Sequence, residues 1–190
     1  MTETLDERYA RLCKTPWNIH EHLPTLHALA MQCAHVTELG TERGFSTTAF
    51  LAAQPAELVC VDQMHHPMLA ELRALGDAPI VGRRSFETVV GRTKWSYTLS
   101  ESTAVTLAPT DLLFIDTRHT YAQLAAELAL HADKARRWIV LHDTVSNGLV
   151  GEDPGSEGIT RAVDEFLATG AFVVEAHYPN NNGLTVLARV

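Results

Sequence analysis

The sequence predicts an α/β fold in which a doubly wound, mostly parallel sheet carries helices on both faces. Short apolar runs alternate along the chain with segments of helical periodicity, and strands that alternate with helices form right-handed βαβ units. Several of these runs end at an acidic residue or just before one, as at Asp62, Asp116 and Asp143. The chain closes with two strand patterns around residues 179–183, and a pair joined by such a turn must be antiparallel.

Periodicity and turn residues place the individual elements. Ile80 and Val81 are either a strand or part of an insertion over residues 77–94. The insertion is the preferred interpretation, because Glu101 and Ser102 then follow the end of the next strand. Helices are predicted at 4–13, 23–33, 46–53, 67–75, 120–135 and 159–168, and strands at 34–39, 57–61, 95–99, 111–115, 138–141, 171–177 and 184–190.

Length and composition fit one ordinary globular domain, with a helical lead-in or cap over residues 1–33 and the sheet domain over residues 34–190. The 190 residues include 15 Lys and Arg against 23 Asp and Glu, for a net charge of −8. Nucleic acid is therefore not an expected partner, because cationic contacts supply most of the affinity for phosphate backbones. With neither a signal-peptide pattern nor an apolar run of about 18 residues, we expect a cytoplasmic protein that does not bind membranes.

A glycine-rich turn follows the first predicted strand, in the sequence ELGTERGFS at residues 38–46. Glycines at such a turn let the backbone approach a ligand closely. Glu42 stands where the dinucleotide-binding fingerprint has its second glycine, and the Gly-Lys-Ser/Thr ending of a phosphate-binding loop is absent. The acidic turn favours a ligand with positive rather than negative charge.

Polar residues at the next two strand ends complete the description of that ligand. Asp62 is placed to accept both hydroxyls of a ribose, and Glu101 or Ser102 to contact an adenine ring. A cationic amino-acid moiety, a ribose and an adenine together describe S-adenosylmethionine. Each strand-end acid has an alternative interpretation as the N-cap of the following helix.

Taken with the sequences DLLFID at 111–116 and LHDT at 141–144, these motifs resemble the class I S-adenosylmethionine-dependent methyltransferases. The resemblance runs from about residue 34 to the end and is strongest to the branch with macrocin-type O-methyltransferases and cephalosporin hydroxylase-like proteins. It implies seven strands in the order 3-2-1-4-5-7-6, the last antiparallel. It also implies that the methionine part is held by Glu38, Gly40, Thr41, Gly44 and Ser46, the ribose by Asp62, and the adenine side by Glu101 and Ser102.

A second group of candidate residues, Asp116, His119, His142 and Asp143, lies at two strand ends that we expect to be neighbours. Metal-dependent members of the resembled group place metal-ligating acids at these ends, which implies a metal site of Asp116, His142 and Asp143. Oxygen ligands favour Mg²⁺, whereas the imidazole also admits Mn²⁺, Fe²⁺ or Zn²⁺. The metal-free alternative makes His119 or His142 the general base. The plain structural alternative is that the acids cap helices and the histidines bond to the backbone.

We therefore expect a methyltransferase that uses S-adenosylmethionine, with or without Mg²⁺ or Mn²⁺, to methylate an oxygen or nitrogen of a small molecule. Two alternatives remain: an iron-dependent, hydroxylase-like enzyme on the same fold, and a cofactor-binding module without turnover. A homo-oligomer is compatible with the sequence. Residues 146–158 form either a lid over the site or a solvated connector, whereas His22 and Trp17 are interpreted as structural and residues 180–183 as a turn.

Overall fold

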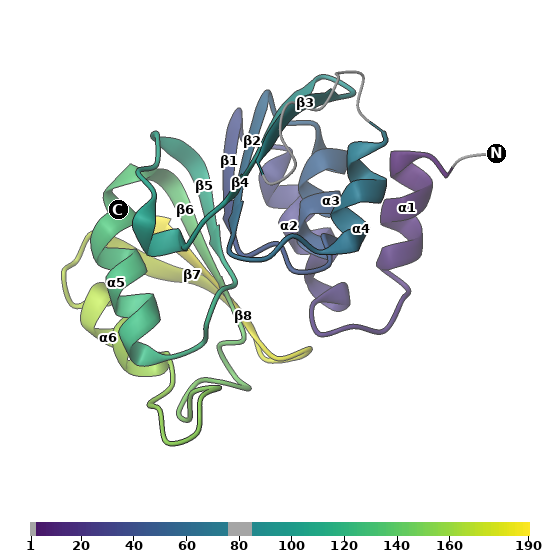
Figure 1. Ribbon diagram of the computed structural model, residues 1–190. Coiled ribbons are helices and arrows are strands. Elements are labelled where there is room, and N and C mark those ends of the chain that lie inside the picture. Colours follow the sequence, from purple (N-terminus) through teal and green to yellow (C-terminus); the bar gives the residue numbers. More distant parts are fainter. Residues whose placement is uncertain (1–2, 76–84) are drawn as a thin grey trace.

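The fold is an eight-stranded sheet between two layers of helices, in a computed structural model that describes residues 3–75 and 85–190 (Figure 1). The strands run in the order β3-β4-β2-β1-β5-β6-β8-β7. Their bounds are β1 His35–Leu39, β2 Glu57–Asp62, β3 Phe86–Val90, β4 Thr93–Leu99, β5 Thr110–Ile115, β6 Ala135–His142, β7 Phe172–Tyr178 and β8 Leu184–Arg189.

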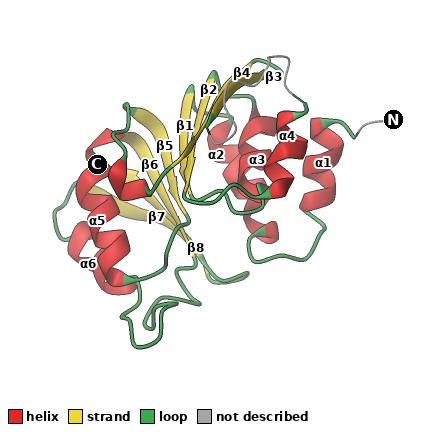
Figure 2. Cartoon of the chain, in the orientation of Figure 1, coloured by secondary structure: helices red, strands yellow, loops and turns green. Residues whose placement is uncertain are grey.

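The helices divide between the two faces of the sheet (Figure 2). One face carries α1 Leu5–Leu12, α2 Leu23–Ala30, α3 Phe45–Ala53 and α4 Pro67–Arg73, and the other carries α5 Tyr121–His131 and α6 Thr160–Leu167. Short 3₁₀ turns lie at His20–His22, Ser102–Ala104 and Ala132–Lys134. The central strands are buried on both sides, which explains why they read as continuous apolar runs.

Two hydrophobic clusters fill the spaces between the sheet and its helices. On the first face, Phe50 of α3 and Leu26 of α2 pack with Phe114 of β5. On the second face, Leu124 and Leu128 of α5 pack with strand residues that include Leu113, Ile115 and Ile139. The leading helices therefore share a core with α3.

The predicted strand order is confirmed, with one correction. If β3 is left aside, the remaining seven strands follow the order 3-2-1-4-5-7-6, and β8 lies antiparallel between β6 and β7. The prediction of seven strands was wrong, because β3 pairs antiparallel with β4 inside the segment interpreted as an insertion. Phe86, Thr88 and Val90 are buried while Glu87 and Val89 are exposed, which is the alternation of an edge strand. Ile80 and Val81 lie outside the described residues.

The predicted helix at 120–135 is too long. The α-helix ends at His131, a 3₁₀ turn follows, and β6 begins at Ala135. The guanidinium of Arg189 donates hydrogen bonds to the carbonyl oxygens of Ala132 (2.9 Å) and Ala135 (2.7 Å), which satisfies backbone groups left free where the helix ends. Among residues 3–75 and 85–190 we find no helix with the length and hydrophobicity needed to cross a bilayer.

Candidate active site

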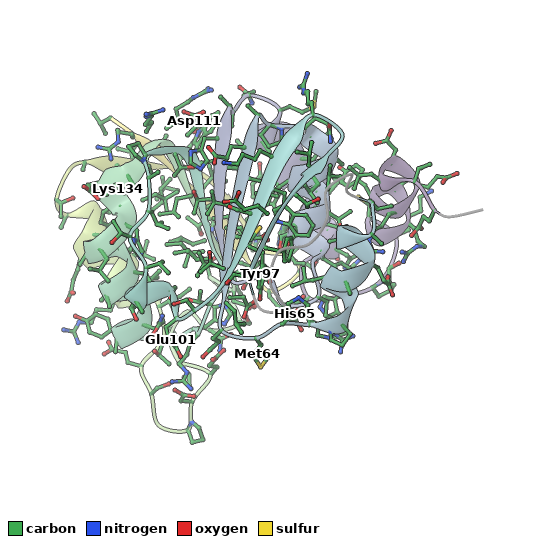
Figure 3. The ribbon with its side chains drawn as sticks, turned by 45° about the horizontal axis from the view of Figure 1, so that its top comes forward. Met64, His65, Tyr97, Glu101, Asp111 and Lys134 are labelled. Carbon is green, nitrogen blue, oxygen red and sulfur yellow. The ribbon has the colours of Figure 1, made fainter. Side chains whose placement is uncertain are left out.

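A cavity of about 450 Å³ opens at the carboxyl ends of β1, β2, β4 and β5. In an open parallel sheet this is the edge at which ligands bind. Figure 3 shows Glu101 and Met64 at this end of the molecule and Asp111 at the opposite end. The cavity is lined by Asn18, Gly40, Glu42, Val61, Asp62, Gln63, Met64, Ser100, Glu101, Ser102, Asp116, Thr117, Arg118, His119, Gln123 and Glu152. Four of the eight predicted cofactor residues are among them.

Gly40 is required by the contact between the glycine-rich turn and the end of β5. Its φ is +85°, and a Cβ built on it would lie 1.9 Å from the backbone oxygen of Asp116. Gly44 also has a positive φ, and a Cβ there would meet Leu72 of α4 at 2.9 Å. These glycines permit close packing within the protein, and Gly40 in addition lines the cavity.

Asp62 holds the glycine-rich turn in place. Its Oδ2 accepts hydrogen bonds from the backbone nitrogens of Thr41 (2.7 Å) and Glu42 (3.0 Å) and from the Thr41 hydroxyl (3.0 Å), while Oδ1 accepts one from Met64 N (2.8 Å). The carboxylate thus lines the cavity and fixes the backbone beside it. Thr41 itself is buried and does not line the cavity.

Glu38 lies beneath the turn and outside the cavity lining. Its carboxylate is fully buried and accepts hydrogen bonds from the hydroxyls of Ser46 and Thr47 and from the thiol of Cys60. Burial raises the pKa of Glu38 to about 7, and these three hydrogen bonds limit the rise. Glu38 and Ser46 therefore join β1 to α3, a role that their place in the motif did not predict.

The part of the cavity that Ser102 and Gln123 line is supported by a buried polar cluster around Glu127 of α5. Ser102 and Thr117 donate their hydroxyl hydrogens to its carboxylate, and Gln123 Nε2 donates to Glu127 (2.9 Å) and to the Ser102 oxygen (3.0 Å). Burial raises the pKa of Glu127 against these hydrogen bonds. Glu101 is exposed at the rim. Sequence reasoning missed Glu127, although its position between Leu124 and Leu128 on the buried face of the helix was a signal.

The structure brings together all four residues of the second predicted group. Asp116 Oδ1 lies 3.0 Å from His119 Nε2 and 3.2 Å from His142 Nδ1, and Asp143 Oδ2 lies 3.2 Å and 3.4 Å from the same two nitrogens. The cause is the parallel pairing of β5 with β6, which sets Ile115 opposite Leu141 and aligns the two strand ends. We call these four residues the Asp–His cluster.

The charges within the Asp–His cluster shift the pKa values of its members in the direction opposite to that caused by burial. Burial lowers the pKa of His119 and of His142, but the bonds and charges of the two carboxylates outweigh it and raise these pKa values to about 9 and about 10. Burial also raises the pKa of Asp116, but the two imidazoles outweigh it and hold that pKa well below its ordinary value. At neutral pH two imidazolium ions therefore balance two carboxylates.

The Asp–His cluster also fits a cation. One donor atom from each of Asp116, His142 and Asp143 lies within 4.8 Å of the others. Two carboxylates and an imidazole suit Mn²⁺, Fe²⁺ or Zn²⁺ as well as Mg²⁺. This is the predicted ligand set, and a divalent cation would balance the same two negative charges that the imidazolium ions balance.

Sequence reasoning missed several residues that surround the Asp–His cluster. Glu152 Oε2 lies 3.0 Å from His119 Nδ1, and the loop that carries it docks through Glu152 N to His119 O (3.2 Å). His22, which was interpreted as structural, packs edge-to-face on His142 with ring centroids 5.8 Å apart. His22 Nε2 also lies 2.9 Å from the carbonyl oxygen of Asn180 in the β7–β8 turn. No local sequence pattern marks contacts between segments about 160 residues apart.

Structural comparison finds the same fold in known proteins. A protein of Corynebacterium glutamicum shares 18% identity at a TM-score of 0.65, with 98% of this chain and 88% of that chain covered. The O-methyltransferase TomG of Streptomyces achromogenes, involved in tomaymycin synthesis and solved with SAM, shares 17% identity at 0.63, covering 100% and 91%. An O-methyltransferase of Bacillus cereus solved with SAH shares 15% identity at 0.65, covering 98% and 89%.

Sequence comparison places the chain in a family. No curated protein sequence matches it. A family model described as a methyltransferase domain matches residues 37–144, which is more than half of the chain and includes both predicted groups of site residues. The resemblance to class I S-adenosylmethionine-dependent methyltransferases is thereby confirmed, and the macrocin-type branch stays a prediction. The chain belongs to the family of methyltransferase domains.

Proposed function

We propose that the protein transfers a methyl group from S-adenosylmethionine to an oxygen or nitrogen of a small molecule. The observation that carries this proposal is that one cavity is lined by Gly40, Asp62 and Ser102 and also by Asp116 and His119. A methyl donor lying along the first three residues would be next to the Asp–His cluster. Methyl transfer is an in-line displacement, so the protein's main task is to position donor and acceptor.

In this proposal the predicted cofactor residues divide into two groups. Asp62 would accept the ribose hydroxyls, and Glu101 and Ser102 would contact the adenine side. Gly40 would let the cofactor approach the backbone. Glu38, Thr41, Gly44 and Ser46 would act indirectly, since their side chains or backbone hold the turn from below.

The Asp–His cluster is where we place activation of the acceptor. Asp116, His142 and Asp143 would hold a divalent cation, which when bound would orient an acceptor hydroxyl and lower its pKa. His119 lies on the cavity wall between Asp116 and Glu152. A cation bound to Asp116 and Asp143 would offset the charges that hold a proton on His119, and the neutral imidazole would then be placed to receive the acceptor's proton. An iron-dependent hydroxylase would need a second histidine ligand, and His119 Nε2 lies 3.0 Å from Asp116 Oδ1 and 3.2 Å from Asp143 Oδ2, so oxygen consumption that depends on Fe²⁺ is the test of this alternative.

Calorimetric titration with S-adenosylmethionine and S-adenosylhomocysteine, each with and without Mn²⁺, tests the proposal. We expect micromolar binding by the unmodified protein and its loss in Asp62→Ala. Because Asp62 also holds the turn, Thr41→Val is the matched control: it removes one hydrogen bond to Asp62 and leaves the carboxylate. Asp62→Ala also removes the bonds from the backbone nitrogens of Thr41, Glu42 and Met64. Binding retained in Thr41→Val and lost in Asp62→Ala therefore supports a direct contact when the two variants unfold at the same urea concentration. Absence of binding by the unmodified protein would contradict the proposed cofactor.

A further inference from the structure

The segment between α1 and α2 contributes one residue, Asn18, to the lining of the cavity and is held in place by contacts on two sides. Trp17 Nε1 donates to Glu42 Oε2 (3.1 Å), and the guanidinium carbon of Arg43 lies 3.9 Å from the centroid of the Trp17 ring. On the other side, Asn181 Nδ2 donates to the carbonyl oxygen of Trp17 (2.8 Å). The segment is thus tied to the glycine-rich turn and to the β7–β8 turn.

Asn18 lies in this segment and lines the cavity. Its neighbour Trp17 is fixed by the contacts just described, and its other neighbour, Ile19, is 3% exposed. The Oδ1 atom of Asn18 is buried and accepts no hydrogen bond within the described part of the chain. A buried acceptor without a partner is costly. The Asn18 side chain lines the cavity, and a rotation of its amide would turn this unpartnered acceptor toward a hydrogen-bond donor on a ligand.

The identity of that donor follows if the proposed function holds. Asn18 adjoins Trp17, whose indole is bonded to Glu42, so it stands at the end of the cavity assigned to the methionine part of the cofactor. That part carries a carboxylate, a sulfonium and an α-ammonium group, and only the ammonium donates hydrogen bonds. We propose that Asn18 Oδ1 accepts a hydrogen bond from the α-ammonium group of S-adenosylmethionine, so that residues before the matched domain complete the cofactor site.

Binding measurements on two ligands and two variants test this inference. The ligands are S-adenosylhomocysteine and its analogue in which hydrogen replaces the α-ammonium group. Asn18→Leu keeps the approximate size and removes the acceptor, whereas Asn18→Asp keeps an acceptor and removes the amide donor. We expect Asn18→Leu to bind S-adenosylhomocysteine about 10- to 100-fold more weakly, as for loss of a hydrogen bond to a charged group. Its affinity for the analogue should be unchanged, and Asn18→Asp should bind S-adenosylhomocysteine no more weakly than the unmodified protein.

Each other outcome overturns the inference. Equal weakening for both ligands in Asn18→Leu would mean that Asn18 only shapes the wall. A loss in Asn18→Asp as large as in Asn18→Leu would mean that the amide nitrogen donates to the cofactor carboxylate instead. Asn18→Ala, compared on the same two ligands, replaces Asn18→Leu if that variant does not fold. Failure of the unmodified protein to bind S-adenosylhomocysteine at all would refute the proposed function and would be seen before any variant is measured.

Discussion

Glu38 is the residue whose replacement gives the sharpest test of the site's internal structure. Its carboxylate is fully buried between β1, β2 and α3, and its hydrogen-bond donors are two hydroxyls and a thiol, all of them neutral. Among these neighbours no cation compensates the charge. The change to test is Glu38→Gln, which keeps the size of the side chain and removes its ionisation.

The expected magnitude follows from the pKa of Glu38, which burial raises from 4.5 to about 7. The folded protein holds this proton more tightly than the unfolded chain does. The stability that this group contributes is therefore complete below pH 4.5 and is lost as the pH rises to about 7. At about 1.4 kcal/mol per pH unit, the loss amounts to roughly 3 kcal/mol. Glu38→Gln has no such loss.

Urea denaturation between pH 4.5 and pH 8 measures this effect. The difference in unfolding free energy between the unmodified protein and Glu38→Gln should move by roughly 3 kcal/mol in favour of the variant across this range. Titration of the Asp–His cluster is common to both proteins and cancels in the difference. Glu87→Gln, at an exposed position of β3, is the control and should show no comparable trend. Parallel curves for the unmodified protein and Glu38→Gln would refute the argument that burial disfavours the carboxylate.

Two further predictions concern the turn and the cluster. Gly40→Ala should lower the unfolding free energy by more than about 2 kcal/mol in urea denaturation, because the new methyl group meets the Asp116 carbonyl in addition to straining the backbone. Gly155→Ala has a similar φ but nothing within 4 Å, so it should cost only about 1 kcal/mol, and equal losses would contradict the packing argument. For the metal, Asp143→Asn should weaken Mn²⁺ binding about 10-fold or more in calorimetry, while Glu101→Gln, in the same cavity but outside the cluster, should not. Unchanged Mn²⁺ affinity in Asp143→Asn would exclude Asp143 as a ligand.

The sequence was sufficient to predict the residues that depend on parallel strand ends. Asp116 and Asp143 lie close together because β5 and β6 pair in register, and that pairing follows from the order of apolar runs and helices. The same reasoning placed Asp62 and Ser102 at one edge of the sheet. Acids that end strands can be recognised in the sequence because each parallel strand brings its carboxyl end to the same edge of the sheet.

Some side chains point in a direction, or have a partner, that depends on contacts between segments far apart in the sequence, and these were not predictable in this way. Glu38 was expected to hold the ligand, but β1 is covered on both faces, so alternation along HVTEL does not reveal that its side chain turns toward α3. Asn18 and His22 reach the site because the leading segment contacts both the glycine-rich turn and the β7–β8 turn. For β3, the β-branched residues before Gly91 were a hairpin signal, and they were overlooked because the sequence of residues 77–94 was interpreted as an insertion.

Some residues of the glycine-rich turn line the cavity and others hold the turn from below, and this affects which parts of the chain can set the ligand preference. Two residues of the motif that carries the family resemblance, Glu38 and Ser46, bond to one another beneath the cavity. Changes at such positions alter the stability and placement of the turn, whatever ligand is bound above it. The groups that face the cavity from outside the motif, such as Asn18, Gln123 and Glu152, come from the leading segment, α5 and the loop after β6. These segments lie outside the strands of the sheet, so their residues can be substituted without disturbing the pairing of β1 with β5. Under the proposed function, the choice of methyl acceptor is to be sought in the segment beside the Asp–His cluster, the loop after β6 that carries Glu152, rather than in the motif that identifies the family.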